Sequence, residues 1–173
     1  MLKFRNKKIS NSEYAEQVAG FSTKYFEDFE SISEPIASRK NAVWVSTVSF
    51  CILITLKHFN AQSVDYKKGG EAINEVIRQV AAMMANPGKE KTVYHALMED
   101  FDDVQERFGS LPTQQRNKED SPGGTLFWEF AKYKLSLSEG KKVEDLFKSM
   151  HVIELLSKLT SVLDAQEFAR STK

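Results

Sequence analysis

One long apolar segment constrains the fold of this chain more than any other feature. Residues 43–56 read Val-Trp-Val-Ser-Thr-Val-Ser-Phe-Cys-Ile-Leu-Ile-Thr-Leu and, wound as a helix, are apolar around the whole circumference. Such a helix is stable only when other elements surround it. The run has 14 residues, whereas crossing a bilayer takes about 20. We therefore expect a buried central helix over about residues 36–59 and no transmembrane segment. A β-strand is the alternative, because Val, Ile and Thr favour strands.

Helical spacing of apolar residues continues through most of the chain. A capping box, Ser10 to Glu13, precedes a stripe that begins at Tyr14 and ends near Ile32. Further helices are expected up to Met84, over 89–108, from 126 to about 138–140, and over 141–169. Gly69-Gly70 is interpreted as the end of a connection, and Gly109 as a left-handed cap. The sequence predicts an all-α, single-domain bundle of six or seven helices around the apolar one.

The last of these helices carries an apolar stripe that changes face. Val143, Leu146, Phe147 and Met150 form its first part, and Val152, Leu155, Leu156, Leu159 and Leu163 form the second. A straight helix has one stripe. We therefore expect a bend or break near residues 149–151.

Length and charge set the domain organisation and limit the partners. A chain of 173 residues suits one domain. We assign residues 1–9 to a basic N-terminal lead and 10–173 to the helical domain, with a flexible loop at 109–124 because that stretch is polar and long. Lysine plus arginine equals aspartate plus glutamate at 24 each, so no nucleic-acid partner is expected. With one cysteine and no visible signal peptide, the expected location is the cytoplasm.

One polar stripe has the composition of a metal site. His95, Glu99, Asp102 and Glu106 are spaced four, three and four residues apart, so they share a helix face. The apolar residues Leu97, Phe101, Val104 and Phe108 occupy the opposite face. Metal sites of helical bundles project inward from several helices. We therefore interpret the stripe as a solvated acidic face and predict no metal.

No catalytic group is predicted. The three histidines, His58, His95 and His151, belong to separate elements, and Cys51 lies inside the apolar run, where a thiol is inert. The chain lacks a nucleophile elbow, a zinc-protease motif, a phosphate-binding loop and a dinucleotide fingerprint. The sequence therefore does not decide whether the protein is an enzyme, although it favours a non-enzyme, and we expect no cofactor.

The helix from residue 126 to 137 is apolar on two opposite faces. Leu126, Phe130, Tyr133 and Leu137 form one face, whereas Trp128 and Leu135 lie behind them with Lys132. Either the helix is sandwiched between layers, or Trp128, Leu135 and Lys132 form an exposed interaction surface. The alternation in 132–138 also permits a strand, although two strands alone are marginal.

These observations favour a non-enzymatic cytoplasmic bundle that binds a protein partner. Self-association as a homodimer through Trp128 and Leu135 is the first such contact. The first alternative is a bundle that binds an apolar small molecule or lipid beside Phe50, Phe127, Phe130 and Trp128. The second is a metal-dependent enzyme that uses His95 and Glu99.

Overall fold

The apolar segment forms the central helix of an all-helical bundle, as the sequence predicts. The structure is a computed structural model and describes residues 8–113 and 123–173. Within these residues it contains seven α-helices, one 3₁₀ turn and no strand. The elements are α1 (Asn11–Glu30), η1 (Ala37–Arg39), α2 (Lys40–Ala61), α3 (Tyr66–Met84), α4 (Glu90–Phe108), α5 (Leu126–Glu139), α6 (Leu146–Val162) and α7 (Ala165–Thr172).

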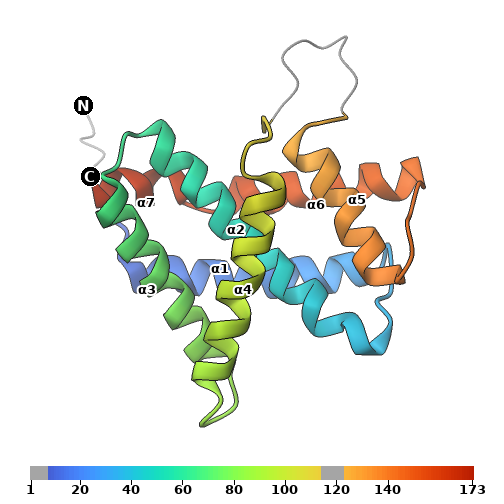
Figure 1. Ribbon diagram of the computed structural model, residues 1–173, viewed down its shortest axis with the longest axis horizontal. Helices are drawn as coiled ribbons and strands as arrows, with labels where there is room; N and C mark the ends of the chain where they lie inside the picture. The colour runs from blue at the N-terminus through green and yellow to red at the C-terminus, as the bar shows by residue number, and fades with distance from the viewer. Residues whose placement is uncertain (1–7, 114–122) are drawn as a thin grey trace, which may run out of the picture.

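Helix α2 crosses the middle of the molecule and contacts α1, α3, α4, α5 and α7 (Figure 1). Its residues from Ser46 to Thr55 are all buried. The neighbours α3 and α4 pair as an antiparallel hairpin, and α5 pairs with α6. Helix α6 packs mainly on α1 and α5 and therefore belongs to an outer layer. The central helix α2 is therefore covered on several sides, whereas the outer helix α6 has two main neighbours.

The first helix begins where the sequence predicts. Ser10 caps α1: its hydroxyl accepts from the Glu13 backbone N–H at 3.2 Å, and the Glu13 carboxylate accepts from the Ser10 N–H at 3.0 Å. Such a box satisfies backbone donors that a helix start leaves unpaired. Tyr14, four residues into the helix, is fully buried, which directs the apolar face of α1 onto α2.

The C-terminal helix closes one end of the bundle. Phe168 of α7 stacks on Tyr14 with ring centroids 4.3 Å apart and contacts Phe59 of α2 at 5.6 Å. The Gln17 side-chain amide donates to the Asp164 carboxylate at 2.8 Å. Segments at the two ends of the sequence therefore share one aromatic cluster.

Several sequence-based boundaries were wrong. Gly69 and Gly70 lie inside α3, which begins at Tyr66 because the Asp65 carboxylate caps it. Gly109 is right-handed, with φ −60°. The final segment has no break near 149–151, because α6 is continuous there; the break lies between Val162 and Ala165, and 141–145 is not helical. Most of the predicted lead 1–9 and loop 109–124 lies outside the described residues.

The central helix is longer than its apolar core. The helical stretch Ala37–Ala61 has 25 residues, so by length and composition it is long and apolar enough to cross a membrane. The sequence-based argument from 14 residues therefore underestimated its length. Of its most apolar window, 67% is buried inside the bundle, as in the core helix of a packed domain.

The two adjacent glycines of α3 give a stability prediction with a built-in control. A Cβ on Gly69 would lie 3.0 Å from the ring of Phe59, which is itself buried, whereas a Cβ on Gly70 meets nothing within 4 Å. We expect Gly69→Ala to lower the free energy of unfolding by about 1–3 kcal/mol through overpacking. Gly70→Ala should raise it by about 0.5–1 kcal/mol, because alanine favours helix. Urea unfolding measures both, and equal signs would contradict the close packing of Phe59 on α3.

Candidate functional site

The most unusual side chain in the molecule is a lysine with no access to solvent. Lys134 of α5 is fully buried, and its ammonium lies against the beginning of α2. It donates to the Val43 carbonyl, to Ser46 Oγ at 3.0 Å and to Thr47 Oγ1 at 2.6 Å. The Ser46 and Thr47 hydroxyls donate in turn to the same Val43 carbonyl. Three donors of an ammonium thus meet three oxygens of one helix turn.

Aromatic rings cover the other side of this ammonium. Lys134 Nζ lies 5.6 Å from the centroid of the Tyr25 ring and 5.5 Å from that of Phe29, both on α1. These separations fit cation–π attraction. Burial lowers the pKa of Lys134 from 10.5 to about 7, and the negative charge of Asp100 opposes this shift. The amine therefore lies near its titration midpoint at neutral pH, but it is enclosed by α1, α2 and α5.

Polar side chains of α2 have other partners in the core. Ser49 donates to the Asp100 carboxylate of α4 at 2.5 Å, while burial raises the pKa of that carboxyl group. The Tyr14 hydroxyl is hydrogen-bonded to Thr55. Cys51 is buried, with its sulfur 3.6 Å from Ser22 Oγ, and burial raises the pKa of the thiol to about 12. The thiol therefore stays protonated, as its place in the apolar run predicts.

The exposed interaction surface predicted on α5 is wrong in one of its three residues. Leu135 is fully buried, so it is not part of an exposed patch, while Trp128 and Lys132 are half-buried. The helix is covered by α2 on one side and α6 on another, which matches the sandwiched alternative. The strand alternative for residues 132–138 was wrong, because this segment is helical.

The predicted aromatic ligand site is occupied by its own rings. Phe50 stacks on Phe130 with centroids 4.6 Å apart and meets Phe127 edge-on at 5.6 Å. Phe50 and Phe130 are fully buried. These contacts fill the space in which an apolar ligand would lie, so this cluster is part of the core.

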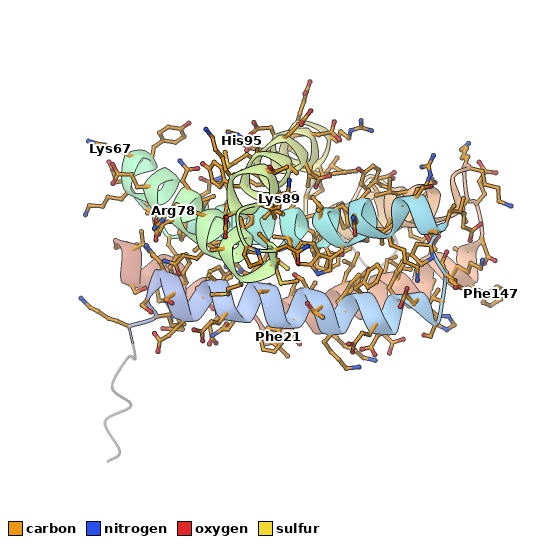
Figure 2. The ribbon with its side chains drawn as sticks, turned by 90° about the horizontal axis from the view of Figure 1, so that it is seen from below. Phe21, Lys67, Arg78, Lys89, His95 and Phe147 are labelled. Atoms are coloured by element: carbon orange, nitrogen blue, oxygen red, sulfur yellow. The ribbon has the colours of Figure 1, made fainter. Side chains whose placement is uncertain are left out.

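The acidic stripe of α4 faces solvent. His95, Glu99, Asp102 and Glu106 are all exposed, and Leu97, Phe101, Val104 and Phe108 on the opposite face are all buried, as the spacing predicts (Figure 2 shows His95 at the surface). In the described part of the chain, no group of three or more histidine, cysteine, aspartate or glutamate side chains is placed to hold a metal ion. His58 lies in the last turn of α2, and His151 is exposed on α6.

Large apolar side chains are exposed at several places, among them Tyr66, Met83 and Met84 of α3, and three of them lie together on α6. At the start of α6, Leu146 is 57%, Phe147 81% and Met150 51% exposed, and we call these three residues the α6 patch. Figure 2 shows Phe147 at one end of the molecule. The sequence shows that the apolar stripe changes face here, and a bend or break was the expected reason. The change of face instead marks a second, exposed apolar face of one continuous helix.

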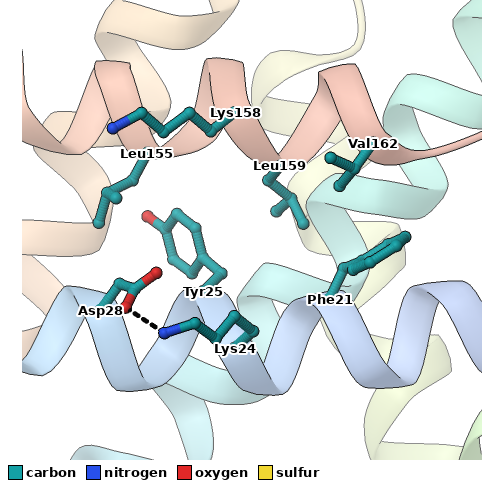
Figure 3. A pocket seen from close by; sticks show the side chains of 8 residues that line it. All are labelled: Phe21, Lys24, Tyr25, Asp28, Leu155, Lys158, Leu159 and Val162. Carbon is teal, nitrogen blue, oxygen red and sulfur yellow. Dashed lines mark hydrogen bonds and ion pairs between the residues drawn. The ribbon is translucent and has the colours of Figure 1, made fainter.

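A cavity of about 250 Å³ lies between α1 and α6 (Figure 3). Phe21 and Tyr25 of α1 line it from one side, and Leu155, Leu159 and Val162 of α6 from the other. Lys24, Asp28 and Lys158 are its charged lining residues, and Lys24 is paired with Asp28 at 2.6 Å. Sequence analysis missed this cavity, because each of its walls is an ordinary apolar helix face.

Comparison with known proteins adds no assignment. No protein-family model matches the chain, and neither the curated proteins nor the solved structures contain a significant match. Functional inference therefore rests on the α6 patch, the cavity and the buried lysine.

The buried lysine predicts a specific pH dependence of stability. Because the pKa of Lys134 falls from 10.5 in the unfolded chain to about 7 in the fold, the unfolded state binds more protons between these values. The free energy of unfolding should therefore rise with pH above 7, by at most about 1.4 kcal/mol per pH unit. Lys134→Met should remove this rise relative to wild type between pH 7 and about 8.5, and urea unfolding at each pH measures it.

The same variant tests whether the lysine is needed for stability. Ser46 and Thr47 still donate to the Val43 carbonyl in Lys134→Met, so no buried donor loses its partner. We expect stability at pH 7 equal to or above that of wild type. Lys132→Met, on the half-buried lysine of the same helix, is the control and should keep the wild-type pH dependence. An unchanged slope in Lys134→Met would refute the role of this amine.

Proposed function

We propose that this protein acts by binding another protein chain and that a second copy of itself is the first partner, docked through the α6 patch. The observation that carries the proposal is the exposure of Leu146, Phe147 and Met150 within about one turn of helix. Contiguous exposed apolar side chains of this kind are typical of interaction sites. Phenylalanine at 81% exposure is the natural anchor, because aromatic side chains dominate the energy of interfaces.

The position of α6 explains why no other element in residues 8–113 and 123–173 covers this surface. Helix α6 buries Val152, Leu156 and Leu159 against the bundle, and it packs mainly on α1 and α5. The α6 patch lies on a different side of the helix from these residues. The patch is therefore open to contact with another chain.

The charges around the α6 patch favour a second copy as the partner. Lys141 and Lys142 precede it, and Glu144, Asp145 and Glu154 surround it, all exposed. In a two-fold dimer each surface meets its own copy, so a mixture of both signs is self-complementary, whereas a single sign repels. The net charge of zero also means that two copies do not repel each other as whole molecules. A small patch of this kind supports a reversible dimer with micromolar affinity.

A charge placed in the α6 patch should abolish the dimer. We expect wild-type protein to pass from monomer to dimer across the micromolar range in sedimentation velocity, and Phe147→Glu to remain monomeric. Burying an unpaired carboxylate in an apolar contact is costly, which weakens association at least tenfold. Circular dichroism should show the same helix content in both proteins, because Phe147 is exposed in the monomer.

Tyr66 provides the matched control. It is 93% exposed at the start of α3, and the adjacent Lys67 lies at the opposite end of the molecule from Phe147 (Figure 2). Tyr66→Glu should dimerise like wild type. Wild-type protein that stays monomeric at high micromolar concentration, or a Phe147→Glu variant that dimerises normally, would refute the proposal.

A further inference from the structure

The cavity between α1 and α6 contains an unsatisfied polar group. The Tyr25 hydroxyl is buried and has no hydrogen-bond partner among residues 8–113 and 123–173. A buried hydroxyl without a partner is unusual, because losing its hydrogen bonds to water costs free energy. Tyr25 lines the cavity, and Figure 3 shows its hydroxyl directed toward α6, close to Leu155.

The tyrosine ring is fixed where it lies. Its face carries the Lys134 ammonium at 5.6 Å, and the Phe29 ring packs beside it with centroids 6.0 Å apart. Moving the ring to find another partner would expose the buried charge of Lys134. The hydroxyl therefore stays directed at the cavity, and a ligand reaches it by displacing the half-buried Leu155 side chain.

The walls of the cavity define the rest of the ligand. Phe21, Leu155, Leu159 and Val162 form an apolar lining for a ring or a branched chain. The charged side chains of the lining are two lysines, Lys24 and Lys158, and one aspartate, Asp28. Both lysines are ion-paired, Lys24 with Asp28 at 2.6 Å and Lys158 with Glu154 at 3.2 Å. The Lys158 pair is the longer and the more exposed of the two, so Lys158 is the cation that can turn to an anionic ligand.

The volume limits the size of the ligand. A cavity of about 150 Å³ holds benzene, and pockets for drug-sized ligands begin at about 300 Å³. The observed 250 Å³ lies between these values, so a long acyl chain does not fit.

From these features we propose that the cavity between α1 and α6 binds a small aromatic or branched aliphatic carboxylate, whose oxygen accepts a hydrogen bond from the Tyr25 hydroxyl. The apolar body lies between Phe21 and the α6 leucines, and Lys158 supplies the balancing charge. The binding site is separate from the α6 patch and does not depend on the proposed dimer.

Calorimetric titration with 3-phenylpropionate tests the site. We expect saturable binding to wild-type protein, weaker binding of the neutral 3-phenylpropanamide and none of propionate, which lacks the ring. Tyr25→Phe should weaken binding of 3-phenylpropionate about tenfold, the effect of one hydrogen bond to a charged acceptor. Leu155→Trp, which fills the cavity, should abolish binding.

Tyr14→Phe is the matched control. Tyr14 is also buried on α1, but its hydroxyl is hydrogen-bonded to Thr55. Its removal should lower the melting temperature and leave the affinity for 3-phenylpropionate unchanged. Tyr25→Phe should have the opposite pattern: an equal or higher melting temperature without ligand, because an unsatisfied hydroxyl is removed, and a smaller rise with ligand.

Each remaining outcome would overturn the proposal. These outcomes are no binding of 3-phenylpropionate to wild type, binding that survives Leu155→Trp, equal affinity of Tyr25→Phe and wild type, and equal affinity for the amide and the carboxylate. A second cavity, of about 560 Å³, is lined by Trp44, whose buried indole N–H also lacks a partner among the described residues. Binding that Trp44→Phe abolishes and Tyr25→Phe leaves intact would place the ligand there and refute the assignment.

Discussion

The need to cover α2 on every side governs the whole architecture. A helix without a polar face has no side that can rest against water, so five other helices contact it, and its contact with α4 is the most extensive between any two described elements. The helices that touch α2 bury their apolar faces in doing so. Helix α6 does not belong to this group of helices around α2 and packs mainly on α1 and α5.

Burial of the α2 residues from Ser46 to Thr55 also encloses their hydroxyl groups, and this creates the polar interior of the protein. Ser46 and Thr47 receive the Lys134 ammonium, Ser49 donates to Asp100, and Thr55 is bonded to Tyr14. These contacts join α2 to α5, α4 and α1 with directional bonds, which apolar packing alone does not supply. Lys134 therefore helps to set how α5 lies across α2, although its charge is costly to bury.

Both proposed functions use α6, the outer helix, whose apolar side chains are only partly covered by other helices. Helix α6 has two apolar faces, of which its neighbours cover one, and the uncovered face is the α6 patch. Its junction with α1 is imperfectly filled, and the result is the cavity, with the buried Tyr25 hydroxyl behind the Leu155 side chain. The Tyr25 ring lines the cavity and also contacts the Lys134 ammonium, so one side chain belongs to both features. The fold tolerates an exposed apolar patch and a cavity at α6 because the packing around α2 supplies most of the buried core.

The sequence by itself determined the helical fold class, the burial of residues 43–56, the capping box at Ser10 and the outward direction of the acidic stripe on α4. Each of these follows from spacing within one helix, which the chain carries locally. Only the tertiary structure decided that Leu135 is covered, that Phe147 is not, and that Lys134 and Tyr25 meet in the interior. Those outcomes depend on which neighbour packs on which face, and periodicity shows that a face is apolar without showing what covers it. The same reason explains why two glycines, usual markers of turns, lie inside α3: the close approach of Phe59 to Gly69 becomes visible only when the helices are packed together.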